Sequence, residues 1–313
     1  MTKNPQLKIG LTGHFSIDSY NPETGEHREY EFDNLITNGG LERLGTAGSG
    51  FVVDYVQVGT GSTAPANTDS ALANWLAGTR RISGGGTGPT VTESYGGNPT
   101  YHTETTYTWE FDQGAAAGNL SEIGVGWASS GSLFSRALIV DGSNNPTTIT
   151  VQAIEFLTVT YKLRMYPPTA DVTGTITLDG ADYDYIIRPA YAGGSTWASQ
   201  GRRAYASHTT SNSAYSYTGD IGAMTAGPSG TASALITTAA DAYSAGSHKR
   251  TIGFDAGINA WNLAGGIRSV AVYVIGYGGE NQMGWQCQFD PKIPKDNTKE
   301  LSLTFDVSWA RKP

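Results

Sequence analysis

The sequence predicts an all-β protein of two related β-sandwich-like domains, with short helices in the connections. The first observation is composition: of 313 residues, 41 are glycine, 17 are tyrosine and only 15% are charged, which is typical of short strands joined by tight turns. The second is that apolar and polar residues alternate in several stretches, the pattern of half-buried strands. The third is an internal repeat.

The repeat relates residues 105–164 to residues 250–311. Each copy carries a Phe-Asp pair and, at the same spacing behind it, an Asn-Leu pair: residues 111–112 and 119–120, then 254–255 and 262–263. Each copy continues with short apolar runs and ends in a long alternating segment. This pattern predicts one β-rich unit used twice, as an internal duplication would produce.

The N-terminal elements follow from local patterns. Alternation from Leu7 to Ile17 predicts a strand, residues 21–25 a turn, and Tyr30 the start of a returning strand, which together make a hairpin. Leu41 and Leu44 lie at helical spacing and predict one or two helical turns. Residues 51–58 form an apolar run that predicts another strand.

A second short helix is expected behind this strand. Asp69 is a suitable N-cap, and Gly78 is a suitable residue for the end of the helix. Leu72, Trp75 and Leu76 between them fall at i, i+3 and i+4. Residues 80–101, rich in Gly, Thr, Ser and Pro, are expected to form an exposed loop.

The domain boundary is expected at residues 165–169, since paired prolines cannot continue a hydrogen-bonded ladder. The predicted domains are residues 1–166 and 167–313. The second opens with a hairpin that turns at Asp179-Gly180. Its Ala-, Ser-, Thr-, Gly- and Tyr-rich region, residues 191–249, keeps too many aromatic residues for a disordered linker and predicts small-residue strands and loops at a surface.

Charge and targeting signals exclude several classes. A formal net charge of −8 argues against nucleic-acid binding, which needs clustered Lys and Arg. We expect neither a signal peptide nor membrane insertion, because no apolar stretch has the required length. Cys287 is the one cysteine, so no internal disulfide can form, and its aromatic neighbours predict a buried structural thiol.

Two loops resemble ligand sites only superficially. Residues 58–63 (VGTGST) lack the lysine of a phosphate-binding loop and the third glycine of a dinucleotide fingerprint, so a structural turn is favoured. Asp179, Asp182 and Asp184 cluster as in calcium loops, but without the remaining ligands of an EF-hand. A hydrated turn is the preferred interpretation, with a weak calcium site as the alternative.

No catalytic residue or cofactor is predicted. The five histidines show no zinc spacing, and no nucleophile elbow is present. Glu104, Glu110 or Glu122 could pair with Asp112 as glycosidase carboxylates, but their alternation with Thr and aromatic residues favours the solvent face of strands.

Aromatic residues supply the remaining candidate site. The region that follows residue 190 has too few large aliphatic residues to bury all its rings, and amphipathic rings suit a protein interface or stacking against sugars. Packing within the domain or between subunits is the other interpretation. The candidates are Tyr191, Trp197, Tyr205, Tyr215, Tyr217 and Tyr243.

Several stretches follow one another in order between residues 30 and 166: FDNLITNGGL at 32–41, VQVGTGSTAP at 56–65 with Asp69 and Leu72, EIGV at 122–125, LFSRAL at 133–138, PTTI at 146–149 and VTYKLR at 159–164. Through this ordered succession, about half the chain resembles the tail and tail-tip virion proteins of tailed bacteriophages. The resemblance implies a β-sandwich module without enzymatic activity that docks to a tail or baseplate, often in several copies.

The expected function is therefore that of a structural virion protein of the tail tip, baseplate or fibre attachment. It would be made in the host cytoplasm, form a homo-oligomer and contact other tail proteins. The alternatives are a tail protein that binds a host receptor or carbohydrate through the aromatic region, and a capsid decoration or head-fibre protein. A polysaccharide hydrolase comes last.

Overall fold

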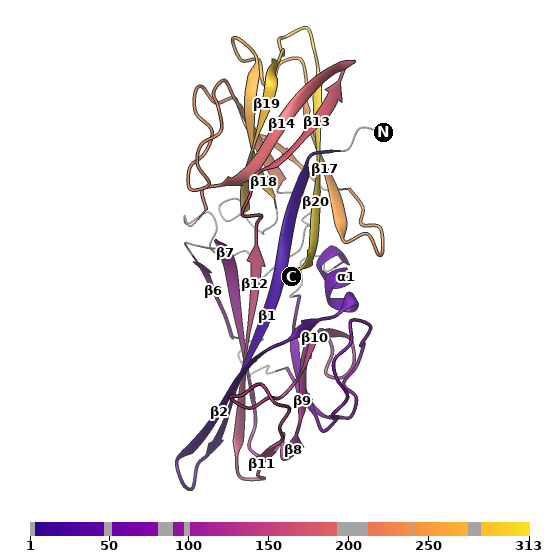
Figure 1. Cartoon of the computed structure of the whole chain (residues 1–313), viewed down its shortest axis with the longest axis vertical. Coiled ribbons are helices and arrows are strands. Elements are labelled where there is room, and N and C mark those ends of the chain that lie inside the picture. The colour runs from indigo at the N-terminus through magenta and orange to yellow at the C-terminus, as the bar shows by residue number, and fades with distance from the viewer. Residues whose placement is uncertain are drawn as a thin grey trace. The chain divides into compact units, whose positions relative to one another are not determined.

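The computed structural model describes residues 4–46, 52–80, 90–96, 101–192, 212–239, 241–274 and 283–313. The regular structure of the described residues consists of strands and one short helix, which confirms the all-β prediction (Figure 1). The elements up to residue 166 are β1 (Gln6–Asn21), β2 (Glu26–Asp33), β3 (Leu35–Ile36), α1 (Asn38–Thr46), β4 (Tyr55–Gly59), β5 (Trp75–Thr79), β6 (Thr90–Gly96), β7 (His102–Phe111), β8 (Gly118–Leu120), β9 (Glu122–Gly126), β10 (Leu133–Leu138), β11 (Ile149–Val151) and β12 (Phe156–Tyr166).

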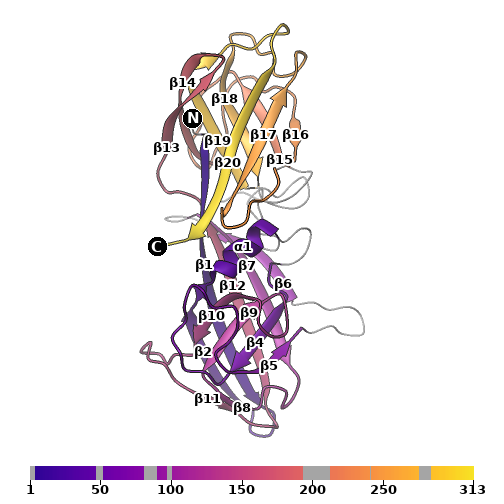
Figure 2. The ribbon, with the colours of Figure 1, turned by 90° about the vertical axis from the view of Figure 1, so that its right-hand side faces the viewer.

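The remaining elements are all strands. They are β13 (Val172–Leu178), β14 (Ala181–Ala190), β15 (Asn212–Tyr217), β16 (Ile236–Thr238), β17 (Lys249–Ala256), β18 (Ile267–Val274), β19 (Met283–Ile293) and β20 (Leu301–Arg311). The strands form three larger sheets (Figure 1, Figure 2). The first has the strand order β17-β20-β1-β12-β7-β6, and β2 also pairs with β1. The second has the order β3-β10-β9-β4-β5, and the third has the order β13-β14-β19-β18-β15-β16.

The chain divides into two compact units by its internal contacts. Unit 1 contains residues 1–10, 94–103 and 165–310, and unit 2 contains residues 11–93, 104–164 and 311–313. The main division thus falls close to the paired prolines, while the first ten residues belong to the same unit as the second half of the chain.

Unit 2 is a sandwich whose core lies between the inner faces of its two larger sheets. Phe15 on β1 and Tyr161 on β12 are fully buried, with ring centroids 4.9 Å apart. Trp109 on β7 donates its indole N–H to the Asp54 carbonyl beside β4, at 3.0 Å. Burying side chains of this size stabilises the fold by about 1.5–3 kcal/mol each.

Both expected hairpins are present. Strands β1 and β2 pair antiparallel from His14↔Asp33 to Asn21↔Glu26. Strands β13 and β14 are joined by Asp179 and Gly180, with φ of 50° and 77°. Positive φ at both central residues is the geometry of the turn that matches the twist of a two-residue hairpin.

The short helix with Leu41 and Leu44 is confirmed as α1, and both side chains are buried. The helix expected from Asp69 to Gly78 is wrong: β5 forms there and pairs with β4 from Val56↔Thr79 to Gly59↔Trp75. Tertiary contacts override the local pattern, because the Glu122 carboxylate accepts the backbone N–H groups of residues 73 and 74 at 2.9 and 2.7 Å.

Two other expectations need correction. The strand expected at 51–58 begins only at Tyr55. Val52 and Val53 precede it and are buried without being part of the strand. The expected loop at 80–101 contains a strand, β6, while its residues 81–89 and 97–100 lie outside the described part of the chain.

Parts of the two repeated segments follow the same succession of strands, although the first also contains β8 and β11, which pair with each other. In the first, β7 pairs with β12, and the β9–β10 hairpin between them belongs to another sheet. In the second, β17 pairs with β20, and the β18–β19 hairpin between them again belongs to another sheet. This shared order is what a duplicated unit would have, and duplication itself stays a prediction.

Candidate functional site

Three of the predicted surface tyrosines come together in unit 1 with a fourth that the sequence did not single out. Tyr215 and Tyr217 lie on β15, and Tyr273 lies on the adjacent strand β18. Tyr191 stacks on Tyr273 with ring centroids 6.4 Å apart, and Tyr215 meets the same ring edge-on at 6.3 Å. Tyr273 was missed because it sits in an apolar run that reads as core.

The phenol groups of this tyrosine cluster interact with one another. Burial, with the neighbouring phenols, raises the pKa of Tyr217 to about 12 and moves the pKa of Tyr273 in the same direction. The phenol of Tyr191 contributes to both of these shifts. All four side chains are half-buried, so the cluster is partly packed rather than fully displayed at the surface.

Two glutamines hold a loop over the sheet beside the tyrosine cluster. Gln286 on β19, which is fully buried, accepts the N–H of Gly222 at 2.8 Å and donates to the carbonyls of Ala223 and Ala226 at 3.0 and 3.1 Å. Gln288 accepts the N–H of Ile221 at 3.1 Å. The backbone of residues 221–226 therefore covers these two glutamine side chains.

The other predicted aromatic residues do not join the cluster. Tyr243 stacks on buried Trp309 with ring centroids 5.9 Å apart. The guanidinium of Arg250 lies 5.6 Å from the centre of the Tyr243 ring. Trp197 and Tyr205 lie outside the described residues. The six candidates therefore do not form one surface: Tyr243 packs at another place, against β20.

The three aspartates of the calcium candidate have separate partners. Asp179 is a turn residue, while Asp182 and Asp184 each accept a threonine hydroxyl of β13 across the hairpin at 2.6 Å. Within the described ranges, no group of three or more His, Cys, Asp or Glu side chains could hold a metal ion.

The glycine-rich loop at 58–63 folds around a carboxylate of the protein itself. Gly61 N–H donates to the Glu122 carboxylate at 3.0 Å. A Cβ at Gly61 would lie 2.4 Å from that carboxylate oxygen, so only glycine fits. The loop is therefore a structural turn, and its glycines serve the approach to Glu122.

Glu122 is completely buried, so its expected place on a solvent face is wrong. It lies on β9, and its partner Arg136 lies on the neighbouring strand β10, with Arg136 Nε donating at 2.9 Å. Arg136 also donates to Asp69 at 2.6 Å and to the Thr63 carbonyl at 2.8 Å. Burial disfavours the ionised form of Asp69, but the hydrogen bonds that its carboxylate accepts from Arg136 and from the Ala66 N–H hold its pKa below the usual value.

Two of the four candidate glycosidase carboxylates, Glu104 and Glu122, are likewise engaged by other groups. Glu104 on β7 accepts a hydrogen bond from Arg164 on β12 at 2.5 Å, with its side chain 14% exposed. Glu122 is enclosed by backbone amides and Arg136. Glu110 on β7 and Asp112 just behind that strand are both exposed, and Glu110 lines an open surface groove with Asp18 and Phe156.

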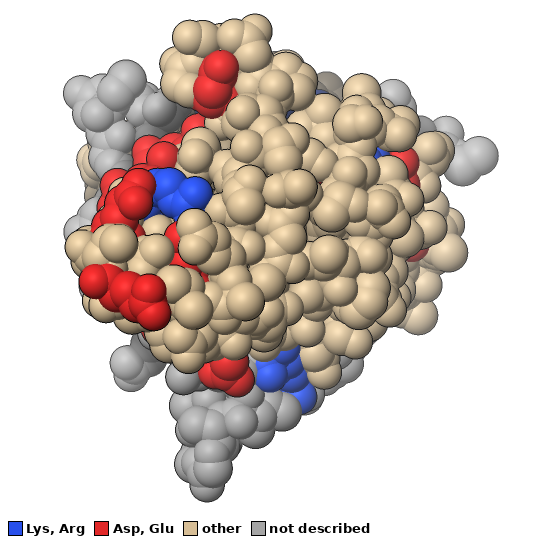
Figure 3. All heavy atoms as spheres, turned by 90° about the horizontal axis from the view of Figure 1, so that it is seen from below, with Lys and Arg blue, Asp and Glu red and all other residues tan. Residues whose placement is uncertain are grey.

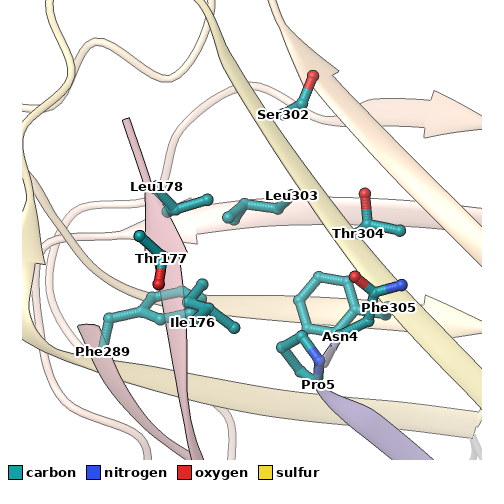
Figure 4. A pocket seen from close by; sticks show the side chains of 10 residues that line it. All are labelled: Asn4, Pro5, Ile176, Thr177, Leu178, Phe289, Ser302, Leu303, Thr304 and Phe305. Atoms are coloured by element: carbon teal, nitrogen blue, oxygen red, sulfur yellow. The ribbon is translucent and has the colours of Figure 1, made fainter. Parts of the chain in front are cut away.

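Unit 1 also contains a small cavity of about 100 Å³ (Figure 4). Figure 4 shows Leu178 of β13 and Leu303 of β20 extending toward each other, with Phe305 beside Pro5. Ligand pockets usually measure about 300–1,000 Å³, so this space is a packing defect at the edge of the core.

Cys287 is buried as expected, and desolvation raises the pKa of its thiol.

The described helix α1 is too short and too polar to cross a bilayer. No family model matches the chain, and neither a curated protein nor a solved structure matches it significantly.

Proposed function

We propose that this chain is a non-enzymatic structural protein of a tailed-bacteriophage virion, located at the tail tip, baseplate or fibre attachment. The observation that carries the proposal is the convergence of the phage-like stretches in unit 2. Stretches that are distant in sequence, at 32–41, 56–65, 122–125 and 133–138, meet in one hydrogen-bonded network.

The contacts in this network are specific. Thr37 donates its hydroxyl to the Leu133 carbonyl at 2.7 Å and accepts the Gly40 N–H at 2.9 Å, so it fastens the start of α1 to β10. Glu122 and Arg136 join β9 and β10 to the loop around Gly61. The phage-like succession thus consists of residues that a single folding module needs, which supports its assignment to a module of that family.

The chemistry of the described residues favours assembly over turnover. Two of the four carboxylates that the sequence offered for catalysis, Glu104 and Glu122, are engaged by Arg164, Arg136 and backbone amides. Proteins of this kind act in several copies, so we propose a homo-oligomer that contacts other tail proteins. Synthesis in the host cytoplasm and incorporation into the virion follow from the same proposal.

Host attachment is the second candidate function. The half-buried tyrosine cluster at Tyr191, Tyr215, Tyr217 and Tyr273 favours it, because amphipathic rings at a surface suit receptor contacts. A capsid decoration or head-fibre protein would use the same kind of surface contact at another position in the virion.

Immunogold electron microscopy of phage particles tests the location. A peptide tag inserted in the exposed turn at residues 22–25, between β1 and β2, should carry gold to the tail tip. Gold on the head would support the decoration alternative and overturn the tail assignment. Particles without the chain would refute the virion role, and release of sugar reducing ends by the purified chain would refute the non-enzymatic claim.

A further inference from the structure

The third sheet ends on one side in a strand whose outer edge is bare. Strand β13 pairs with β14 and is the last strand of its sheet (Figure 2). In the described part of the chain, no other strand or loop makes a backbone hydrogen bond to β13. A row of unpaired N–H and C=O groups of this kind is a template for pairing with a further strand.

The geometry of the hairpin identifies the unpaired backbone groups. Residues 179–180 form a two-residue turn, so Leu178 and Ala181 on either side of it are the hydrogen-bonded pair that closes the hairpin. In an antiparallel ladder such pairs alternate with pairs that make no hydrogen bonds. The even-numbered residues of β13 therefore bond to β14, and the backbone groups of its three threonines point away from β14. These are Thr173, Thr175 and Thr177.

The sequence of this edge lacks the features that keep strand edges from pairing. Natural edges are blocked by charged side chains, proline or bulges. The residues of β13, VTGTITL, include neither a charge nor a proline, and the register with β14 has no bulge. The outer strand β2 differs, because its sequence EHREYEFD is rich in acidic residues. Figure 3 shows acidic groups gathered along one side of the end of unit 2 that it views.

A buried aromatic ring reaches this edge with a hydroxyl that lacks a partner. Tyr185 on β14 lies directly opposite Gly174 on β13 and is only 6% exposed. A Cβ at Gly174 would lie 2.5 Å from the Tyr185 hydroxyl oxygen, so the ring extends across the glycine to the outer strand. Among the described residues, no group forms a hydrogen bond with this hydroxyl. Its partner must therefore come from beyond the edge, from water or from another chain.

A second copy of the same strand is complementary to this edge. When two copies of β13 pair antiparallel about a twofold axis at Gly174, Thr173 of one copy lies opposite Thr175 of the other. These threonines carry the outward backbone groups, so they form hydrogen-bonded pairs. On the other face, Val172 lies opposite Ile176 of the other copy. Pairs of threonine and pairs of β-branched apolar residues are favourable neighbours across strands.

The hydroxyl of Tyr185 and the nearby charges favour this axis. With the axis at Gly174 the two glycines face each other, so the two Tyr185 hydroxyls approach the axis and can bond each other. An axis at Thr175 would instead place Asp171 of one copy opposite Asp179 of the other. Like charges directly opposite each other are destabilising.

We propose that β13 pairs antiparallel with β13 of a second copy about an axis at Gly174, so that two sheets become one. This interface deepens the homo-oligomer proposed above and rests on that part of the proposed function. A strand of seven residues is about 24 Å long with an edge about 10 Å thick, so pairing covers on the order of 250 Å² per partner. A stable interface needs about 800 Å² per partner. The purified dimer should therefore be weak and depend on concentration, and the high local concentration within an assembly would strengthen it.

Sedimentation equilibrium of the purified full chain tests this pairing. The parent should show a monomer–dimer equilibrium that shifts with concentration. Thr175→Pro removes an outward N–H that β14 does not use, so the variant should fold and its dimer dissociation constant should rise at least about tenfold. Thr175→Val is the matched control, because both variants lose the hydroxyl that donates to Asp184 but only valine keeps the N–H. Its dissociation constant should stay within about threefold of the parent's.

A second variant makes the test independent of proline. Tyr185→Phe removes the hydroxyl at the axis, which has no partner among the described residues of its own chain. The monomer should therefore keep its unfolding temperature, while the dissociation constant of the dimer rises about fivefold through the loss of one hydrogen bond. Thermal unfolding at low protein concentration checks that each variant keeps its fold.

Cysteine cross-linking tests the register. Oxidation of a mixture of Thr173→Cys and Thr175→Cys chains should give mainly the mixed disulfide, because these two positions face each other across the proposed axis. The native Cys287 is buried and present in every sample. A Thr175→Cys chain that cross-links mainly to itself would overturn the register.

Other results would overturn the pairing itself. These are a parent that stays monomeric at every concentration, a Thr175→Pro chain that dimerises as tightly as the parent, and a Thr175→Val chain that dissociates as readily as Thr175→Pro. A monomeric parent that binds another tail protein, with Thr175→Pro abolishing the binding, would assign the edge to that protein. Labelling of particles tests the virion location separately, so the pairing and the location can each fail alone.

Discussion

Arg136 and Glu122 form an ion pair that is sealed from solvent, with N–O distances of 2.9 and 2.8 Å and side chains only 2% and 0% exposed. The pair lies on adjacent strands, and its remaining hydrogen-bonding capacity is used by Asp69, Thr63 and the backbone of residues 61, 73 and 74. Three of the stretches that resemble the phage family, at 56–65 with Asp69, at 122–125 and at 133–138, supply residues to this network.

Removing one member of this pair should strongly destabilise the protein. Arg136→Met leaves the Glu122 carboxylate buried without its counter-ion, which costs about 3–5 kcal/mol. Urea unfolding should show a much lower midpoint. Arg188→Met is the control, because the Arg188–Asp171 pair is 27% and 40% exposed and such pairs contribute about 0–1 kcal/mol. Equal effects of the two variants would contradict the role given to the buried pair.

Two adjacent glycines of α1 should respond oppositely to alanine. A Cβ at Gly40 would lie 2.2 Å from the Phe134 carbonyl oxygen, so Gly40→Ala must push the helix off β10. The nearest atom to a Cβ at Gly39 is 3.4 Å away, an ordinary contact, so Gly39→Ala should be neutral or stabilise by up to about 1 kcal/mol through helix propensity. Thermal unfolding of both variants measures this, and a Gly40→Ala protein at least as stable as the parent would show that α1 does not pack this closely.

Tyr161 should make stability fall at alkaline pH. Desolvation raises its pKa to about 12, from an ordinary value of 10.0. Between these values the folded state keeps a proton that the unfolded state releases, so the stabilisation is complete below about pH 10 and is lost as pH rises toward 12. Urea unfolding at a series of pH values should show this fall.

The matching variants separate ionisation from packing. Tyr161→Phe should reduce the alkaline fall without abolishing it, because Tyr217 and Tyr273 also have raised pKa values. The variant costs about 1 kcal/mol at neutral pH by removing the hydrogen bond from Asn34. Tyr20→Phe, on the solvent face of β1, removes one phenol without touching the core and should leave the fall intact. A Tyr161→Phe protein with the parent's pH profile would assign the alkaline effect to another group.

Local patterns predicted those parts of the fold whose energetics are local. The turn at Asp179-Gly180 needs residues that tolerate positive φ, and the alternation along β1 needs only a sheet with one buried face. Segment 69–78 failed because its helical spacing was outweighed by hydrogen bonds to Glu122, a residue almost fifty positions later in the chain.

Candidate sites were harder to predict than elements. The sequence favoured a structural turn for residues 58–63, but nothing in those residues reveals that a buried carboxylate fills the loop. The aromatic composition after residue 190 drew attention to Tyr191, Tyr215 and Tyr217, while Tyr20, His27 and Phe156 occur singly, in separate strands, and gave no composition signal. Strand order alone makes neighbours of these last three.

The sequence by itself therefore determined the all-β class, the two hairpins, helix α1 and the burial of Cys287, because periodicity, turn residues and hydrophobicity act over a few residues. Only the tertiary structure decided that Glu122 is a buried partner of Arg136 and that the rings of Tyr20, His27 and Phe156 stack together. Both outcomes depend on which strands pair, and pairing is settled by the packing of residues far apart in the chain.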